Sequence, residues 1–264
     1  SLVGSEMCIR DRDSFKVEAE KRGYDITFIN HNISGRSMTY LEHCHYRSVD
    51  GVVIACVNFY DPQVVELVNS DVPVVTIDHV FNNRMAVLSD NVAGLKALVK
   101  QAWACGHRRI AFIHGEKTSV TENRIAGFYQ ACEELGLEIP EEYVRDGVYH
   151  DVERCAEETR ALLALPQRPT CIIFPDDFSA LGGYNALAEA GLSIPDDISV
   201  MGYDGIYLSR VVNPSLVTYQ QNTAALGQTA ADKLIELIEH PRVTLPEQIR
   251  VSGRLLSGGS VRSL

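Results

Sequence analysis

The chain has 264 residues, which at roughly 150 residues per domain suits one large α/β domain or two lobes. Its 45% hydrophobic and 22% charged residues are the composition of a folded globular protein, and they exclude a disordered linker or a collagen-like chain. The 24 Lys and Arg against 35 Asp and Glu leave a net charge of -11 without a basic stripe, so this chain alone is a poor binder of nucleic acid.

Regular patterning begins at Asp13, because residues 1–12 fit neither a helical nor a strand template and are expected to be a non-native leader. Short apolar runs then alternate with helical patterns, as in parallel strands buried on both faces. The predicted helices cover 14–22, 37–46, 62–69, 91–105, 121–135, 153–163, 178–190 and 223–239. The predicted strands cover 25–30, 51–55, 72–78, 108–114, 143–146, 171–175, 198–204, 216–219 and 249–255. This alternation predicts an α/β fold with more parallel strands than one open sheet comfortably holds, so two sheets or a barrel are expected.

Neither a membrane segment nor a secretory signal is visible in the sequence. No stretch approaches 18 uncharged apolar residues, and no basic segment leads into an apolar one, so a cytoplasmic location is expected. The seven cysteines contain no C-x-x-C pair and predict buried, reduced thiols rather than a disulfide framework or a zinc site. His43, Cys44 and His45 are adjacent, so their side chains would diverge on a helix and no metal site is expected.

The sequence lacks the motifs that usually mark an α/β enzyme. It contains no G-x-x-x-x-G-K-[ST] loop, no G-x-G-x-x-G after a strand, no G-x-S-x-G elbow and no H-E-x-x-H helix. We therefore expect a protein that is not an enzyme and that needs no cofactor.

Polar and aromatic side chains directly follow several predicted strands, and ligands of open α/β sheets bind beyond the carboxyl ends of strands. Neighbouring carboxylates repel each other, whereas a polyhydroxylated ligand gives each of them hydroxyl groups to bind. An arginine supplies the matching donor, and aromatic rings pack on the apolar face of a sugar. The candidate ligand-binding residues are Phe81, Arg124, Tyr149, Asp176, Asp204 and Gln221.

Each candidate also has an ordinary structural explanation. Asp176 or its neighbour Asp177 could cap the following helix, and Asp204 could form an Asx turn. Arg124 could form a surface ion pair, and Tyr149 could belong to the core. The shared position of these residues at strand ends favours a binding site.

With these residues in place, the sequence resembles the effector-binding domain of the LacI/GalR family of bacterial transcription regulators. The motifs GHRRIAFIHG at 106–115 and IPDDISVMGYD at 194–204 distinguish this family from periplasmic sugar-binding proteins of the same fold. Further matches in family order are DGVVIA at 50–55, VPVVTIDH at 72–79, Asp90, Asn91 and Gly94 of a DN-x-x-G pattern, NRIAGF at 123–128, RPTCIIFPDDFSALGGYNAL at 168–187 and NPSLVTYQQ at 213–221.

The resemblance implies two Rossmann-like subdomains of the periplasmic binding protein type I kind, joined by three crossovers near Asp90–Asn91, Gln221 and His240–Pro246. The expected N-terminal subdomain comprises 13–90 and 222–242, and the C-terminal subdomain comprises 91–221 and 247–258, followed by a tail at 259–264. The family's first strand and its amino-terminal helix-turn-helix are expected to be absent, so the N-terminal subdomain is expected to be incomplete.

The resemblance also implies roles for the candidate residues. Arg124 resembles the family's effector-binding arginine and Tyr149 its stacking aromatic, although Val148 stands where the family usually has an acidic residue. Asp176 occupies a position that binds ligand hydroxyls, and Asp204 resembles the aspartate of the G-[YF]-D motif. Gln221 resembles the partner of that aspartate, and Phe81 is the least direct of these assignments.

These observations predict the ligand-sensing and dimerisation domain of a sugar-responsive repressor that reaches operator DNA only through an N-terminal domain outside this chain. A neutral sugar is expected as the effector, because two acidic groups and one arginine suit it better than a purine or a phosphosugar. A periplasmic sugar-binding protein that serves a transporter is the alternative, and an α/β enzyme acting on a sugar is a more distant one. The identity of the effector and of the operator is not encoded in any motif.

Overall fold

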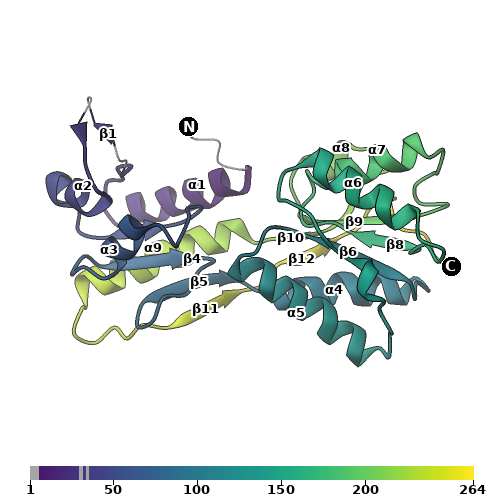
Figure 1. Cartoon of the computed structure of the whole chain (residues 1–264). Helices are drawn as coiled ribbons and strands as arrows, with labels where there is room; N and C mark the ends of the chain where they lie inside the picture. Colours follow the sequence, from purple (N-terminus) through teal and green to yellow (C-terminus); the bar gives the residue numbers. More distant parts are fainter. Residues whose placement is uncertain (1–5, 30–31, 34–35) are drawn as a thin grey trace. The chain divides into compact units, whose positions relative to one another are not determined.

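The computed structural model describes residues 6–29, 32–33 and 36–264, and these form two compact units (Figure 1). Unit 1 contains the chain up to Ser89 together with Asn222–Val251. Unit 2 contains Asp90–Gln221 together with Ser252–Leu264. The chain therefore passes from one unit to the other three times, after β5, after β10 and after β11.

Unit 1 is built on a four-stranded parallel sheet in the order β11-β5-β4-β3. The strands are β3 (Val52–Ile54), β4 (Val74–Ile77), β5 (Met85–Ser89) and β11 (Gln248–Val251), and a two-stranded antiparallel sheet pairs β1 (Asn32–Ile33) with β2 (Arg36–Ser37). The helices are α1 (Glu6–Lys21), α2 (Tyr40–Arg47), α3 (Pro62–Val68) and α9 (Thr223–Glu239). Helix α1 packs along α9, whereas α2 packs against α3.

Side chains alternate between the two faces of the unit 1 sheet, and each face has its own apolar cluster. Val75 and Ile77 of β4 pack with Leu226 and Ala230 of α9. Val74, their neighbour in the strand, packs on the opposite face with residues of α2 and α3. A strand covered on both faces is largely apolar, which explains the VVTI of β4, where the hydroxyl of the buried Thr76 donates to the His79 carbonyl.

Unit 2 contains a six-stranded sheet in the order β12-β10-β9-β8-β6-β7, in which β12 alone runs antiparallel to its neighbour. The strands are β6 (Ile110–His114), β7 (Val144–Asp146), β8 (Cys171–Ile173), β9 (Ser199–Asp204), β10 (Val217–Gln220) and β12 (Arg254–Leu256). The helices are α4 (Asn91–Ala104), α5 (Ser119–Glu134), α6 (Val152–Leu163), α7 (Ala180–Glu189) and α8 (Leu208–Val211), with a 3₁₀ turn at Glu141–Tyr143.

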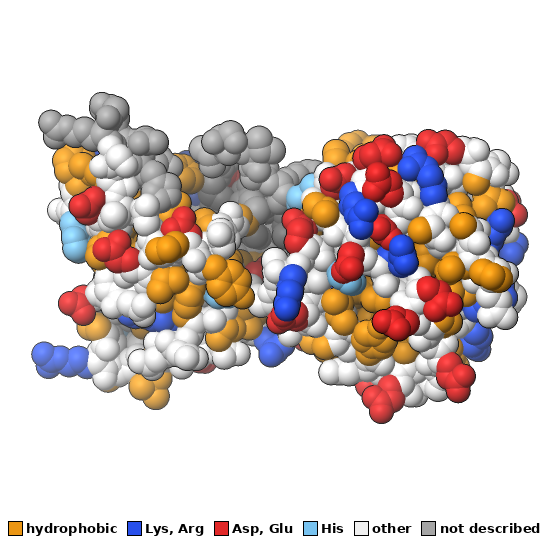
Figure 2. All heavy atoms as spheres, in the orientation of Figure 1, with side chains coloured by type: hydrophobic (Ala, Val, Ile, Leu, Met, Phe, Trp, Pro, Cys, Tyr) orange, Lys and Arg blue, Asp and Glu red, His pale blue; other side chains and the backbone are white. Residues whose placement is uncertain are grey.

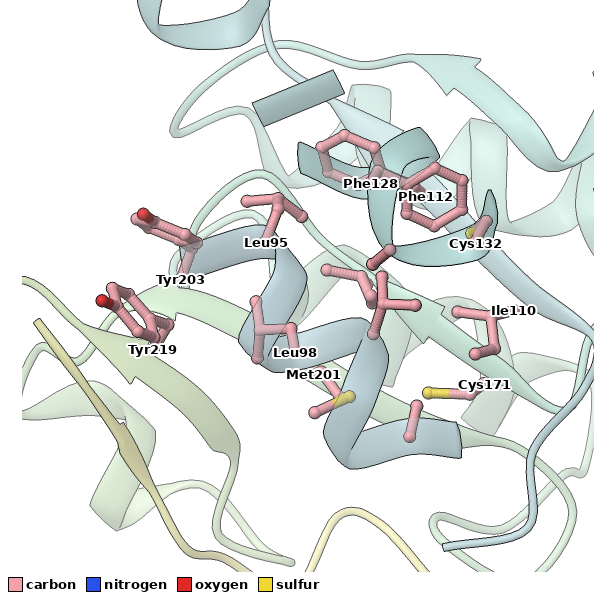
Figure 3. Packing of buried hydrophobic residues seen from close by; sticks show 14 of the residues in the cluster. Leu95, Leu98, Ile110, Phe112, Phe128, Cys132, Cys171, Met201, Tyr203 and Tyr219 are labelled. Carbon is pink, nitrogen blue, oxygen red and sulfur yellow. The ribbon is translucent and has the colours of Figure 1, made fainter. Parts of the chain in front are cut away.

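Helices α4 and α5 cover one face of this sheet, and α6 and α7 cover the other (Figure 1). The first face carries the cluster of Figure 3, in which Phe112 of β6 stacks on Phe128 of α5 with ring centroids 5.3 Å apart. At one end of this cluster, Tyr203 and Tyr219 lie side by side with centroids 5.3 Å apart (Figure 3). This apolar layer supports the ends of β9 and β10, where candidate site residues lie.

The alternating helices and parallel strands predicted from the sequence are confirmed, but the prediction of the strands is wrong in three places. The strand predicted at 25–30 is not found at 25–29, because an extended segment needs a ladder partner and the edge strand β3 pairs only with β4 among the described strands. Asn30 lies outside the described residues. Strand β5 was not predicted at all, although Met85–Ser89 is fully apolar up to its last residue. The single strand predicted at 249–255 is divided, because β11 pairs with β5 and β12 pairs with β10.

The division of that last strand moves the third crossover from the predicted His240–Pro246 to Val251–Ser252. The segment predicted as a tail at 259–264 also belongs to the body of unit 2. The Ser260 hydroxyl accepts a hydrogen bond from the Val217 amide and donates one to the Val200 carbonyl, at 2.8 and 2.6 Å. Burial of these backbone groups requires partners, and the last residues supply them.

Two further expectations need correction. Residues 6–12 are the first part of α1 rather than a segment without regular structure. Good helix formers such as Glu, Met and Arg can extend an existing helix without an amphipathic pattern. Residues 1–5 of the predicted leader lie outside the described residues. Cys56 is an exposed, disulfide-bonded residue instead of a buried thiol, since it lies beyond the buried end of β3 in a turn with φ +56°. Among the cysteines whose side chains the structure describes, the free ones are Cys44, Cys105, Cys132, Cys155 and Cys171.

On the face drawn in Figure 2, Lys and Arg side chains are interspersed with Asp and Glu. This mixing matches the absence of a basic stripe in the sequence. Among the helices that the structure describes, none is both long enough and apolar enough to span a bilayer.

Candidate functional site

Five of the six predicted ligand-binding residues belong to unit 2 and lie at the carboxyl ends of adjacent strands. Arg124 is in α5 after β6, and Tyr149 follows β7. Asp176 follows β8, Asp204 ends β9, and Gln221 follows β10. Because these strands are parallel neighbours, one edge of the sheet gathers side chains that are almost a hundred positions apart in the sequence.

Arg124 is buried and its guanidinium is fixed from several sides. Its Nε donates to Oδ1 of Asn91 at 2.8 Å, and one terminal nitrogen donates to the Pro175 carbonyl at 2.7 Å. The guanidinium carbon lies 3.6 Å from the centroid of the Tyr203 ring, a cation–π stack. With these contacts the other terminal nitrogen is directed to Asp204, 3.7 Å from its Oδ1.

Asp204 ends β9 in an unusual backbone conformation, with φ +98°. The Nε2 of Gln221 donates to Oδ1 of Asp204 at 2.7 Å, and the Gln221 amide donates to the Asp204 carbonyl at 3.3 Å. Burial raises the pKa of Asp204, the nearby Arg124 opposes this rise, and the neighbouring Asp176 adds to it. The carboxylate is therefore held in a low-dielectric site in which its interaction with a donor is strong.

Asp176 combines two roles at the start of α7. Its carboxylate accepts hydrogen bonds from the Ser179 amide and hydroxyl, both at 2.7 Å. This is the helix cap that the sequence also allowed for Asp176. It also accepts the His150 amide at 2.9 Å. Burial raises the pKa of Asp176, but the hydrogen bonds from the side chain and backbone of His150 outweigh it, so the pKa is lowered and the group is a carboxylate.

Tyr149 forms an aromatic surface beside Arg124, with the guanidinium carbon 5.5 Å from its ring centroid. Its hydroxyl is 2.8 Å from the Thr121 hydroxyl, and its amide donates to Glu116 at 2.8 Å. The ring lies directly against Gly115, where an added Cβ would come within 2.2 Å of it. These contacts give the ring one position.

Asp177, the neighbour of Asp176, accepts hydrogen bonds that hold the backbone around the site. Its Oδ1 accepts the Thr218 hydroxyl at 2.5 Å and its Oδ2 accepts the Ile206 amide at 2.8 Å. Both contacts tie the chain that follows Asp204 to β10. Burial, together with the nearby Asp204, raises the pKa of Asp177 well above its ordinary value.

Phe81 is the predicted residue that the fold does not bring into unit 2. It lies in unit 1, where its ring meets His79 edge to face at a centroid distance of 4.6 Å and also contacts Phe59. It packs beside the apolar cluster of α2 and α3.

Sequence reasoning missed three groups that organise this site. Asn91 orients Arg124, Thr121 anchors Tyr149, and His150 contacts Asp176. Asn91 was part of the quoted DN-x-x-G pattern, and that signal could have identified it. Thr121 and His150 belong to no pattern, and only the fold brings them to the site.

Comparison with known proteins identifies relatives of this chain. A family model described as a periplasmic binding protein-like domain matches residues 99–261. The HTH-type transcriptional repressor PurR of Haemophilus influenzae is 31% identical over 251 residues, covering 92% of this chain and 74% of that protein. The ribose operon repressor of the same species is 32% identical over 204 residues, covering 76% of this chain and 61% of that protein.

Solved structures have the same fold. A LacI transcriptional regulator from a Rhodococcus species has a TM-score of 0.86 at 23% identity, covering 99% of this chain and 96% of the other. A LacI family transcriptional regulator from Enterococcus faecium with bound ribose has a TM-score of 0.83 at 25% identity, with the same coverage of both chains.

Proposed function

This chain belongs to the LacI family of transcription regulators and contains its effector-binding domain, and from that premise we propose that unit 2 binds a neutral sugar through Arg124, Asp204 and Gln221. Asp176 and Tyr149 complete the proposed site. The regulator is a repressor like its relatives PurR and the ribose operon repressor, and it is not an enzyme. Family membership favours this function over the periplasmic transport protein considered as the alternative.

The observation that carries the proposal is the fixed, buried pair of Arg124 and Asp204. Arg124 and Gln221 both approach Oδ1 of Asp204, which leaves Oδ2 for a ligand hydroxyl. Charge-assisted hydrogen bonds of this kind are strong, and the donors and acceptors are already oriented before a ligand arrives.

The charges in the site favour a neutral ligand. Asp176 and Asp204 face one guanidinium, so a phosphate or carboxylate would meet more repulsion than attraction. The hydroxyls of a sugar can donate to carboxylates and accept from Arg124, and the Tyr149 ring can pack on the apolar face of the sugar. The E. faecium neighbour with bound ribose supports this class of ligand.

The proposed regulator works by a population shift in a cytoplasmic homodimer. A sugar that binds one arrangement of the protein more tightly than the other changes the share of molecules competent to hold operator DNA. Operator contact is assigned to a DNA-binding segment outside the two described units, which agrees with the net charge of -11. The role of Phe81, which lies in unit 1, stays a prediction from the family resemblance.

A thermal-shift screen tests the proposal, with D-ribose, D-glucose, D-galactose and cellobiose against ribose 5-phosphate and adenine. A sugar present at a hundredfold excess over its Kd stabilises the protein by about 2.7 kcal/mol, which is readily seen. The rise is expected with a neutral sugar and is expected to disappear in Arg124→Lys and Asp204→Asn.

The exposed residues Arg168 and Asp196 provide matched controls. Arg168→Lys and Asp196→Asn make the same chemical changes away from the site and should keep the full response. A response to ribose 5-phosphate or adenine alone, or a sugar response that survives both site substitutions, would contradict the proposal.

A further inference from the structure

His150 occupies a left-handed backbone conformation, which is uncommon for residues other than glycine. Its φ is +59°, in the left-handed region that glycine and asparagine adopt most easily. The residue lies in the turn between β7 and α6, and a histidine there costs conformational energy. A neighbouring group must therefore hold it in place.

Asp176 holds His150 at two points. The His150 amide donates to Oδ2 of Asp176 at 2.9 Å, and the imidazole Nδ1 lies 3.5 Å from Oδ1. The Asp176 side chain is only 1% exposed, whereas that of His150 is 49% exposed. The pair thus connects a buried carboxylate to a half-exposed ring.

The position of Nδ1 determines where the other ring nitrogen lies. In an imidazole the two nitrogens are on opposite sides, so Nε2 is directed away from Asp176 when Nδ1 faces it. Within the described part of the chain, no hydrogen bond involves Nε2 of His150. The ring is flanked by the aromatic rings of Tyr149 and Phe178, at centroid distances of 6.4 and 6.5 Å.

The charges around the ring favour its protonated form. The carboxylates that raise the pKa of the ring come from three segments: Asp176 after β8, Asp204 at the end of β9, and Glu116 after β6. The hydrogen bond with Asp176 raises the pKa of His150, and burial opposes that rise. A protonated ring makes Nε2 a donor, and the three carboxylates still outnumber the two cations, Arg124 and His150, so a neutral ligand remains favoured.

We propose that His150 is a ligand-contacting residue that donates a hydrogen bond from Nε2 to an oxygen of the bound sugar. The inference rests on the proposed function and adds a donor that neither the sequence motifs nor the comparisons assign. It also specifies the ligand further, because the oxygen opposite His150 must be able to accept. A deoxy sugar that lacks this oxygen would be discriminated against.

Two substitutions separate ligand contact from a structural role. His150→Gly removes the imidazole and suits the left-handed backbone, so the unfolding midpoint without sugar should stay close to that of the wild type. The affinity for the sugar should nevertheless fall about tenfold or more, as expected for the loss of a charged hydrogen bond. His150→Gln keeps a neutral donor, and its affinity should be intermediate.

The experiment measures sugar affinity by calorimetry between pH 5.5 and 8, with the sugar that stabilises the wild type most among D-ribose, D-glucose, D-galactose and cellobiose. Wild-type affinity should weaken as the pH rises, because His150 loses its proton. Both His150 variants should lack this part of the pH dependence of the affinity. His45→Gln, which changes an exposed imidazole of α2, should behave as the wild type.

Three results are distinguishable. Weakened binding and a flattened pH profile in the His150 variants, with a normal His45→Gln control, support the inference. Affinities within twofold of the wild type overturn it and leave the proposed function intact. Absence of stabilisation of the wild type by any of the four sugars overturns the proposed function, and the inference with it.

Discussion

Asp177 provides the sharpest test of how the site is held, because its two carboxylate oxygens accept two different donors. Asp177→Ala leaves the buried Thr218 hydroxyl and the part-buried Ile206 amide without these partners. An orphaned buried donor costs about 1–3 kcal/mol, so the two together should cost about 2–6 kcal/mol, towards the lower end because the Ile206 contact is only part-buried. For a domain of this size, that corresponds to a fall in Tm of roughly 10 °C.

Asp177→Asn should behave very differently. Its amide oxygen can accept the Ile206 amide, and its nitrogen can donate to the Thr218 hydroxyl, which turns to accept. The asparagine also avoids burying a charge. We expect a loss below about 1 kcal/mol.

The pH dependence of the stability provides a second test of the role of Asp177. Because the folded pKa of Asp177 is raised, its contribution is present below the ordinary pKa and is lost as the pH rises through the folded value. The stability of the wild type relative to Asp177→Asn should therefore decline with rising pH in that window.

Urea unfolding followed by tryptophan fluorescence is a suitable assay. The single tryptophan, Trp103, lies in α4 and thus reports on unit 2. Thr218→Val in the alanine background should recover part of the loss, because it removes one orphaned donor. Equal destabilisation by alanine and asparagine, or no recovery with valine, would refute the assignment of the loss to these two hydrogen bonds.

Three further predictions follow from the packing of unit 2. Gly94→Ala would place a Cβ 2.2 Å from the Tyr203 hydroxyl and displace that ring from Arg124. The displacement should lower the free energy of unfolding in urea by about 1–3 kcal/mol and weaken sugar binding. Unchanged affinity would argue against a role of the Arg124–Tyr203 stack in binding. Burial lowers the pKa of His107, whose ring contacts the Thr170 hydroxyl and the Arg262 carbonyl. Its contribution to stability should therefore be present above the ordinary histidine pKa and lost as the pH falls. Acid unfolding curves of His107→Gln should lack this dependence. Phe174 is a buried member of the apolar cluster under α6 and α7, and Gly183→Ala would place a Cβ 2.2 Å from its ring. The substitution should lower Tm without changing sugar affinity, and a parallel loss of affinity would contradict a purely core role for Phe174.

Much of the fold could be predicted because parallel strands buried on both faces are apolar throughout. Strand β8 and its surroundings illustrate this, since Cys171 and Ile173 face one cluster while Ile172 faces the other. The divided last strand could not be predicted in this way. Its two halves differ only in which neighbour accepts them, β5 or β10, and periodicity carries no information about partners.

The same distinction applies to the site. Asp176 and Asp204 were accessible from the sequence because each lies at the carboxyl end of an apolar strand, where the ends of parallel strands collect. His150 follows no such strand signal. Its part in the site depends on a left-handed turn and on Asp176, 26 positions further along, and that contact exists only after β7 and β8 have taken their places on either side of β6.

The three passages between the units bear on how the chain folds during synthesis. The sheet of unit 1 lacks β11, and β4 lacks its cover from α9, until more than 220 residues have been made. Until then Val75 and Ile77 lack the α9 part of their cover on that face, where Phe15 of α1 is the contribution made earlier. A nascent chain therefore exposes an adhesive apolar surface while unit 2 is being translated, and slower elongation or a chaperone that shields this surface should raise the yield of soluble protein.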